Sequence, residues 1–309
     1  MKTVYLNKFM SSVVAELEMN GQYGTAHVCG SVLRSVMAFG GEGLPVSGIT
    51  PLWLKAYEGY LLHKGGKGLA WNTVSTYMRM LQAVYNRAVA RKLAAFIPHQ
   101  FRDVFTGRKA DHRRVLERDD MQKLLVEREP DITSPGMAWA RACLELMFRF
   151  HGMPFVDLAH LRKSDLKDGY LTLRRRKTGM PLSARVDGRA MQLLERYRNR
   201  DDTSPYLLCF LDGNLEGMAA YRDYQRILRL LNSRLRALAL WKKVQGKVTS
   251  YSARHTWATV GRYCHIPIEV ISEGLGHASV TTTEGYMKGF GNSRMDRANK
   301  VIMNYIFKG

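Results

Sequence analysis

Cysteine is scarce in this chain of 309 residues, and the four cysteines have no metal-site spacing. Cys29, Cys143, Cys209 and Cys264 form no CxxC pair and no Cys/His zinc pattern. They stand among apolar neighbours, so we expect reduced core residues. The sequence also lacks a GxxxxGKS or GxxxxGKT phosphate loop and a cluster of carboxylates typical of a catalytic metal. These absences argue against an ATP-driven or metal-dependent mechanism, and we expect no metal and no other cofactor.

Long hydrophobic runs are missing as well. No segment approaches the roughly 20 apolar residues that a transmembrane helix needs. The chain has an early lysine, but Glu16 and Glu18 interrupt any apolar core of a signal peptide. The sequence therefore predicts a cytoplasmic protein with no membrane partner.

Acidic residues are few relative to basic ones. The chain has 27 Asp and Glu against 47 Lys and Arg, a net charge of +20 at pH 7. Hydrophobic residues make up 46% of the chain, which is enough to form a core. A folded chain with this excess of positive charge points to a polyanionic partner, and nucleic acid is the first candidate. A membrane-surface protein is the main alternative, but no strongly basic amphipathic stretch with a clean apolar face supports it.

The first hundred residues carry helical patterns. Apolar residues recur at helical spacing near the start and again over 26–39. Thr50 and Pro51 then provide an N-cap followed by proline at the first helical position. A fourth helical pattern opens at Asn72. Four helices joined by short loops predict a small helical domain over 1–100.

The chain changes character after residue 100. Residues 101–112 are polar, basic and poorly periodic, which predicts a linker. Helical patterns resume after it, and the stretch 166–179 alternates around a glycine as a short β-hairpin does. We therefore expect a mainly α fold with a small β-sheet in a second domain, which covers 113–309 and includes a C-terminal tail.

Three elements that are distant in the sequence suggest chemistry when they are taken together. One is the basic stretch RRRKTG, which contains Lys177. Another is Arg254, flanked by small residues at an expected helix start. The third is GLGH, which ends at His277 and is followed nine residues later by Tyr286. Each alone has an ordinary explanation: a solvated basic turn, a structural arginine, a hydrogen-bonded histidine or a half-buried tyrosine.

Together these elements resemble those of the tyrosine recombinase, or phage integrase, family. The resemblance rests on LGH at His277, the nine-residue step to Tyr286, Arg254 upstream and the hairpin lysine Lys177. It covers essentially the whole chain: residues 1–100 resemble the core-binding domain, and residues 113–309 resemble the α+β catalytic domain. The resemblance implies a two-domain clamp around duplex DNA. The pattern also resembles the branch of phase-variation DNA invertases and mobile-element integrases of gut anaerobes.

The resemblance implies that Tyr286 is the nucleophile and forms a 3′-phosphotyrosine with release of a 5′-hydroxyl. Arg254 and His277 would contact the phosphate oxygens, and Lys177 would protonate the departing 5′ oxygen. Elementary chemistry agrees, because a phenol with a pKa near 10 is only about one part in a thousand ionised at neutral pH. Its attack on a phosphodiester that is already negative therefore needs cations and hydrogen-bond donors around the phosphate.

Two positions depart from the family pattern. The family has an arginine two residues after a glycine, whereas here Gly152 is followed by Pro154, which cannot bind phosphate. The missing cation could come from Arg149, from His151 or from elsewhere, and Arg149 is the first candidate, although it could equally be a solvated arginine on a helix. Tyr251 stands where the family often has a histidine, and it can donate to the phosphate or to the nucleophile.

The resemblance further implies duplex DNA with inverted half-sites as the partner, and self-association into a tetrameric synapse on that DNA. The candidate DNA contacts are polar and basic residues of the fourth helix and of the basic turn: Asn72, Ser75, Arg79, Arg87, Arg175 and Arg176. The predicted function is site-specific recombination, by DNA inversion or by integration of a mobile element. One alternative is a catalytically silent integrase-like DNA-binding protein, which Pro154 and Tyr251 favour. Another is a nicking and closing enzyme like the type IB topoisomerases.

Overall fold

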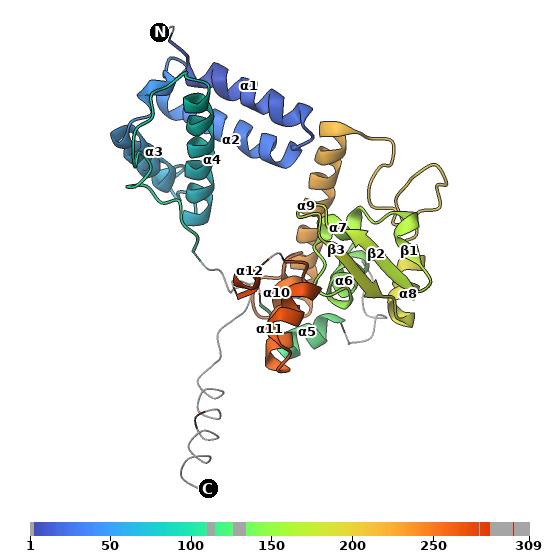
Figure 1. The fold of residues 1–309 in the computed structure, drawn as a ribbon. Helices are drawn as coiled ribbons and strands as arrows, with labels where there is room; N and C mark the ends of the chain where they lie inside the picture. Colours follow the sequence, from blue (N-terminus) through green and yellow to red (C-terminus); the bar gives the residue numbers. More distant parts are fainter. Residues whose placement is uncertain (1–2, 110–114, 126–133, 278, 285–298, 300–309) are drawn as a thin grey trace. The chain divides into compact units, whose positions relative to one another are not determined.

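The computed structural model divides into two compact units (Figure 1). The first consists of residues 1–110 together with 215–221, and the second of residues 111–214 and 222–309. The structure describes residues 3–109, 115–125, 134–277, 279–284 and 299. Among them, no helix has the length and apolar character that crossing a membrane requires.

The described part of the first unit is helical, as the sequence predicts. Its elements are α1 (Leu6–Met19), α2 (Tyr23–Gly40), the short 3₁₀ helix η1 (Val46–Gly48), α3 (Pro51–His63) and α4 (Trp71–Ala90). Helix α3 begins at the predicted signal, because Thr50 Oγ1 accepts a hydrogen bond from the main-chain N–H of Trp53 at 3.1 Å. The apolar faces of the helices meet in one core, which fully buries side chains such as Leu54, Met78 and Leu81.

The segment after α4 is more ordered than the sequence indicates. Its composition predicts a linker over 101–112, yet Phe101 and Val104 are buried in the core of the first unit. The described part of this segment therefore packs as a piece of the helical unit. The polar composition predicts a linker, but two buried apolar side chains are enough to pack a short polar segment against a helical core.

Helices also dominate the second unit, in agreement with the sequence. They are α5 (Arg118–Leu125), α6 (Pro135–Arg149), α7 (Phe155–Ala159), the 3₁₀ helix η3 (Lys163–Asp165), α8 (Gly188–Arg196), α9 (Gly217–Trp241), α10 (Ser252–Tyr263), α11 (Ile268–Gly274) and α12 (Val280–Glu284). The beginning of α9, up to Tyr221, groups with the first unit.

The small sheet of the second unit has three antiparallel strands in the order β1-β2-β3. They are β1 (Leu166–Lys167), β2 (Tyr170–Arg174) and β3 (Pro181–Arg185). Asp168 and Gly169 join β1 to β2 with positive φ angles of 51° and 77°, the conformation that a two-residue hairpin turn requires. Residues 175–180 join β2 to β3 and contain the basic turn.

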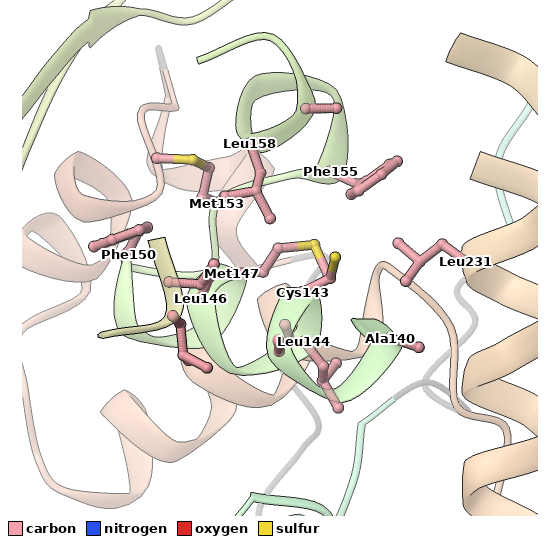
Figure 2. Packing of buried hydrophobic residues seen from close by; sticks show 14 of the residues in the cluster. Ala140, Cys143, Leu144, Leu146, Met147, Phe150, Met153, Phe155, Leu158 and Leu231 are labelled. Carbon is pink, nitrogen blue, oxygen red and sulfur yellow. The ribbon is translucent and has the colours of Figure 1, made fainter. Parts of the chain in front are cut away.

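Helix α6 lies at the centre of the core of the second unit and contacts α5, α7, α8 and α10. Figure 2 shows Cys143, Leu144 and Met147 of α6 among side chains of the following loop, of α7 and of α9. Cys143 and Cys29 are buried, as predicted. The other two cysteines are exposed, which the sequence did not predict: Cys264 directly follows α10, and Cys209 lies in the segment between α8 and α9.

Candidate active site

The sequence GLGH ends helix α11 with a Schellman cap. Gly276 has a φ of 60°, and its N–H donates to the carbonyl of Glu273 at 2.7 Å. The N–H of His277 donates to the carbonyl of Ser272 at 3.0 Å. Glycine suits this left-handed position because a side chain would be strained there. The cap sets His277 just beyond the helix, and the carbonyl of Leu275, which has no partner within the helix, can accept from side chains.

Arg254 of α10 uses this free carbonyl. Its guanidinium donates from Nη2 to Leu275 O at 2.7 Å and from Nη1 to Gly152 O at 3.0 Å. Nη2 also lies 2.7 Å from Nε2 of His277. The side chain is only 2% exposed, so two main-chain carbonyls and one imidazole hold a buried guanidinium in a fixed orientation.

His277 is held from its other side by α12. Its Nδ1 lies 2.8 Å from Oγ1 of Thr283, which is fully buried. Burial of the ring, together with the positive charges of Arg254, Arg175 and Lys177, lowers the pKa of His277 to about 4. The imidazole is therefore neutral at physiological pH, because both burial and the neighbouring cations disfavour its protonated form.

Arg175 reaches the same helix end from the turn between β2 and β3. Its Nη1 donates to Leu275 O and lies 3.5 Å from Gly276 O. Its Nε donates to Asp157 Oδ2 at 2.7 Å, and the main-chain N–H of Arg176 donates to Asp157 Oδ1 at 2.9 Å. Arg175 and Asp157 are 6% and 2% exposed, so this ion pair is buried and attaches the turn to α7.

The structure thus brings several of the candidate residues together. Arg254 contacts His277, and Lys177 is near enough to lower the pKa of that imidazole while its own side chain is exposed. Tyr286, the predicted nucleophile, lies outside the described residues. The arrangement is a concentration of positive charge and donors at one helix end, which is the environment that a negatively charged phosphate needs.

The two candidates for the missing cation lie in other surroundings. Arg149 donates from Nε to Glu145 at 2.9 Å and from Nη1 to Asp187 at 2.6 Å, and within the described chain no contact joins it to Arg254 or His277. His151 has a φ of 56°, and its ring lies 5.6 Å from that of Trp257. Burial lowers the pKa of His151, which disfavours its cationic form. Neither residue offers a second cation beside Arg254.

Two further positions mark the departures from the family pattern. Pro154 is buried and precedes the first residue of α7, so the arginine slot supplies no charge. Tyr251 precedes α10 and is 40% exposed, and its ring lies 6.3 Å from that of His255. The phenol is thus on the surface at the start of the helix that carries Arg254.

Two of the predicted DNA contacts on α4 instead bind the main chain of a neighbouring segment. The side-chain amide of Asn72 donates to Lys109 O and accepts from Lys109 N, each at 2.8 Å. Ser75 is fully buried, and its hydroxyl donates to Gly107 O at 2.6 Å. We name this pair, Asn72 and Ser75, the α4 clasp. It holds the main chain of residues 107–109 on the helical unit, so these side chains are not presented to a DNA groove.

The other basic candidates differ in exposure. Arg79 is exposed on α4, and its side chain has no hydrogen bond or ion pair with another described residue. Arg87 is half-buried, and its charge adds to the effect of Arg91, which lowers the pKa of Glu16. The same charge opposes the burial that raises the pKa of Cys29. Arg176 is exposed in the basic turn, where its main chain is bound to Asp157. Arg79 and Arg176 are therefore the members of this set that are open to a polyanion.

Sequence reasoning placed Arg175 among the exposed DNA contacts and missed its position beside Arg254. The run of three arginines before Lys177 gave no reason to single out the middle one. Strand alternation could have done so, because Leu171 and Leu173 point inward and the next residue in that phase is Arg175. An arginine at an inward position needs a buried partner, and Asp157 provides it.

Comparison with known proteins yields two family models. The phage integrase SAM-like domain matches residues 5–102, and the phage integrase family matches residues 114–290. The chain is 29% identical over 140 residues to tyrosine recombinase XerA of Pyrococcus furiosus, which is 44% of this chain and 46% of that protein. It thus matches less than half of the length of that relative.

Two solved structures share the fold. One is lambda integrase (75–356), solved as a dimer bound to a COC′ core site, with a TM-score of 0.63 and 18% identity over 94% of this chain and 97% of the other. The other is the Tn1549 transposon integrase (aa 82–397) in complex with transposon right end DNA, with a TM-score of 0.66 and 16% identity over 98% and 99%. Both likenesses extend over the helical unit and the α+β unit.

Proposed function

The chain belongs to the phage integrase family, and on that premise we propose that it is a site-specific tyrosine recombinase that cuts and rejoins DNA. The hydroxyl of Tyr286 attacks the scissile phosphorus, the bond from phosphorus to the 5′ oxygen breaks, and a 3′-phosphotyrosine forms. The departing 5′ oxygen takes a proton and leaves as a hydroxyl. Reversal by another 5′-hydroxyl rejoins the strand without ATP, because the phosphodiester energy is kept in the phosphotyrosine.

The observation that carries this proposal is the contact of Arg254 with His277 at the end of α11. A guanidinium fixed by two carbonyls loses little entropy when it binds a phosphate, and its planar fork matches two oxygens. The buried site strengthens each interaction with the charge that develops on the phosphate oxygens. Lys177 is exposed on its turn, and its ammonium group would donate the proton to the departing 5′ oxygen.

His277 would serve as a donor to a phosphate oxygen once the phosphate is bound. In the structure its Nε2 faces an arginine N–H, so this nitrogen accepts. A bound phosphate changes the balance, because its negative charge offsets the cations that lower the pKa of the imidazole. Tyr251, at the start of α10, would add a hydroxyl donor.

For the substrate we propose duplex DNA with inverted half-sites, bound by both units. The net charge of +20 supports a polyanionic partner, and the lambda integrase relative was solved as a dimer on its core site. A tetrameric synapse and a cytoplasmic location belong to the same proposal. The reaction outcome is DNA inversion or integration of a mobile element, since both use the same chemistry.

The test is a suicide duplex with verified half-sites and a nick next to the cleavage point. The wild type should form a protein–DNA adduct that survives denaturation, and Tyr286→Phe should form none. Tyr263→Phe, at the half-buried end of α10, is the matched control and should retain the adduct. Salt-sensitive binding without an adduct would instead support the second candidate, a silent DNA-binding relative, which Pro154 in the arginine slot favours.

A further inference from the structure

The loop before α7 lacks a cationic side chain that the family pattern has at this site. The family pattern puts an arginine where this chain has Pro154, which offers no N–H and no charge. The transition state of the proposed reaction carries more negative charge on its phosphate oxygens than the ground state does. A single buried guanidinium, that of Arg254, would then have to stabilise this charge with the help of a neutral imidazole.

A second guanidinium stands at the same helix end. Arg175 Nη1 and Arg254 Nη2 donate to one oxygen atom, the carbonyl of Leu275. Like charges repel, so two arginines that share an acceptor indicate a place built to hold concentrated positive charge. The lowered pKa of His277 is a second sign of this potential, because Arg254 and Arg175 both contribute to it.

One nitrogen of the Arg175 guanidinium is still able to donate to a ligand. Its Nε is used by Asp157 and its Nη1 by the carbonyls of Leu275 and Gly276. Its Nη2 has no hydrogen-bond partner in the described ranges. This nitrogen is also not among the described side-chain atoms that are fully buried without a partner. Solvent, and hence a ligand oxygen, can reach this nitrogen.

Gly276 provides the space for this arrangement. A Cβ at Gly276 would lie 2.8 Å from Nη1 and 3.3 Å from Cδ of Arg175. The glycine of the LGH segment therefore serves two purposes, the left-handed cap of α11 and the close approach of Arg175. A larger residue there would push the guanidinium away from the carbonyl that it shares with Arg254.

We infer that Arg175 supplies the second phosphate-binding guanidinium of this site, in place of the arginine that Pro154 excludes. The inference rests on the proposed recombinase function. The turn from β2 to β3 then delivers two groups at once: Arg175 to a nonbridging phosphate oxygen and Lys177 to the leaving oxygen. Asp157 is a positioning residue, because its two oxygens bind the Arg175 side chain and the main chain of Arg176 and so seat the turn on α7.

The experiment compares single-turnover cleavage of two suicide duplexes at saturating protein. One has the normal scissile phosphodiester, and the other has a neutral methylphosphonate at that position. Arg175→Ala should slow adduct formation on the phosphodiester by about 100- to 1,000-fold, the cost of losing one donor to a developing oxyanion. On the methylphosphonate, which has one negative charge fewer, the same variant should approach the wild-type rate.

Arg174→Ala is the matched control, since Arg174 is the last residue of β2, comes directly before Arg175 and is exposed. It should change cleavage at saturation by less than about threefold on both duplexes, as expected for a group that makes at most a phosphate contact on the surface. Arg175→Lys keeps the charge and guards against loss of folding; it should stay folded by circular dichroism and recover part of the phosphodiester rate.

Two outcomes would overturn the inference: wild-type cleavage of the phosphodiester by Arg175→Ala, or an equal loss on both duplexes, which a merely structural arginine would cause. Failure of the proposed function looks different, because the wild type itself would then form no adduct on either duplex. Addition of guanidinium ion to Arg175→Ala gives an independent check, and recovery of phosphodiester cleavage is expected.

Discussion

Nη2 of Arg254 and Nε2 of His277 lie 2.7 Å apart. A guanidinium has no acceptor, so Arg254 donates and Nε2 of the imidazole accepts. The ring proton therefore sits on Nδ1, which donates to Thr283 Oγ1 at 2.8 Å. The chain from arginine to threonine defines one tautomer and one orientation of the histidine before any DNA is bound.

This geometry predicts the titration of His277. Burial and nearby cations lower its pKa to about 4, so its ring should stay neutral between pH 5 and 8 in the protein alone. Binding of duplex DNA brings a phosphate to the cations and should raise the pKa. Side-chain NMR of Tyr286→Phe, which binds but does not cleave, measures both states. Titration of the free protein near 6.5 would contradict the hydrogen-bond chain.

Thr283 should act on the reaction through the histidine. Thr283→Val keeps the shape of the side chain but removes the acceptor for Nδ1–H, so the ring loses its fixed tautomer. We expect adduct formation to fall by about 10- to 100-fold, which corresponds to the usual cost of an unsatisfied buried donor. Thr283→Ser keeps the hydroxyl and should retain most of the rate. Equal rates for the valine and serine variants would remove Thr283 from the site.

Gly152 offers a test of stability with a matched control. It has a φ of 67°, and a Cβ there would lie 2.9 Å from the Cα of Arg254. Gly169 has a φ of 77° but nothing within 4 Å of its Cβ position. Gly169→Ala should therefore cost about 1 kcal/mol of unfolding free energy from backbone strain alone.

Gly152→Ala carries the same strain and must also displace the backbone of α10. Its loss should exceed that of Gly169→Ala by about 1–3 kcal/mol, the usual range for an overpacked core. Urea denaturation of both variants measures the difference. Equal losses would show that α10 can shift without cost, and the position of Arg254 would then be less fixed than its two carbonyl contacts indicate.

Local patterns in the sequence predicted helices in both units and the first hairpin of the sheet, but they did not predict β3. The Thr50–Pro51 signal predicted the start of α3, and Gly169 predicted the first turn of the sheet, because these signals depend only on neighbouring residues. The convergence of Arg175 with Arg254 depends on how the β2–β3 turn packs against the end of α11. Residues 79 positions apart come together there, and no local pattern encodes such a contact.

Polar residues on exposed helix faces gave the least reliable predictions. Asn72 and Ser75 fit a groove-reading helix and a clasp for a neighbouring segment equally well, since both uses need small polar groups near the start of a helix. The packed segment itself, residues 101–109, was unrecognised because its polar composition outweighs its two buried anchors. The sequence likewise did not show that the side chain of Arg149 is bound by two carboxylates, one on α6 and one just before α8.

Acid should destabilise the second unit partly through His160. Its Nδ1 lies 2.7 Å from the carbonyl of Val156, and burial lowers its pKa to about 4. An unfolded histidine titrates near 6.5, so the unfolded chain takes up the proton first as the pH falls. The stabilising contribution is thus present above pH 6.5 and is lost as the pH falls toward 4.

In that window His160 should add up to about 1.4 kcal/mol per pH unit to the slope of unfolding free energy against pH. His160→Gln keeps a donor for the carbonyl of Val156 but does not titrate, so its slope should be shallower by that amount. Urea denaturation at several pH values between 4 and 7 measures it. An unchanged slope would mean that His160 is charged in the folded protein.

The α4 clasp and Arg79 make opposite predictions for DNA binding. Arg79 is exposed on α4, and its removal in Arg79→Gln should reduce the log–log salt slope of binding by about 0.9, because one phosphate fewer releases its counterion. Asn72→Ala removes no charge, so the slope should stay at the wild-type value. Its cost should appear in stability instead, since the two hydrogen bonds to Lys109 are lost.

Fluorescence anisotropy over a range of salt concentrations, together with urea denaturation, separates the effect on DNA binding from the effect on stability. A lower slope or altered base preference in Asn72→Ala, with unchanged stability, would return Asn72 to the DNA interface and remove the clasp.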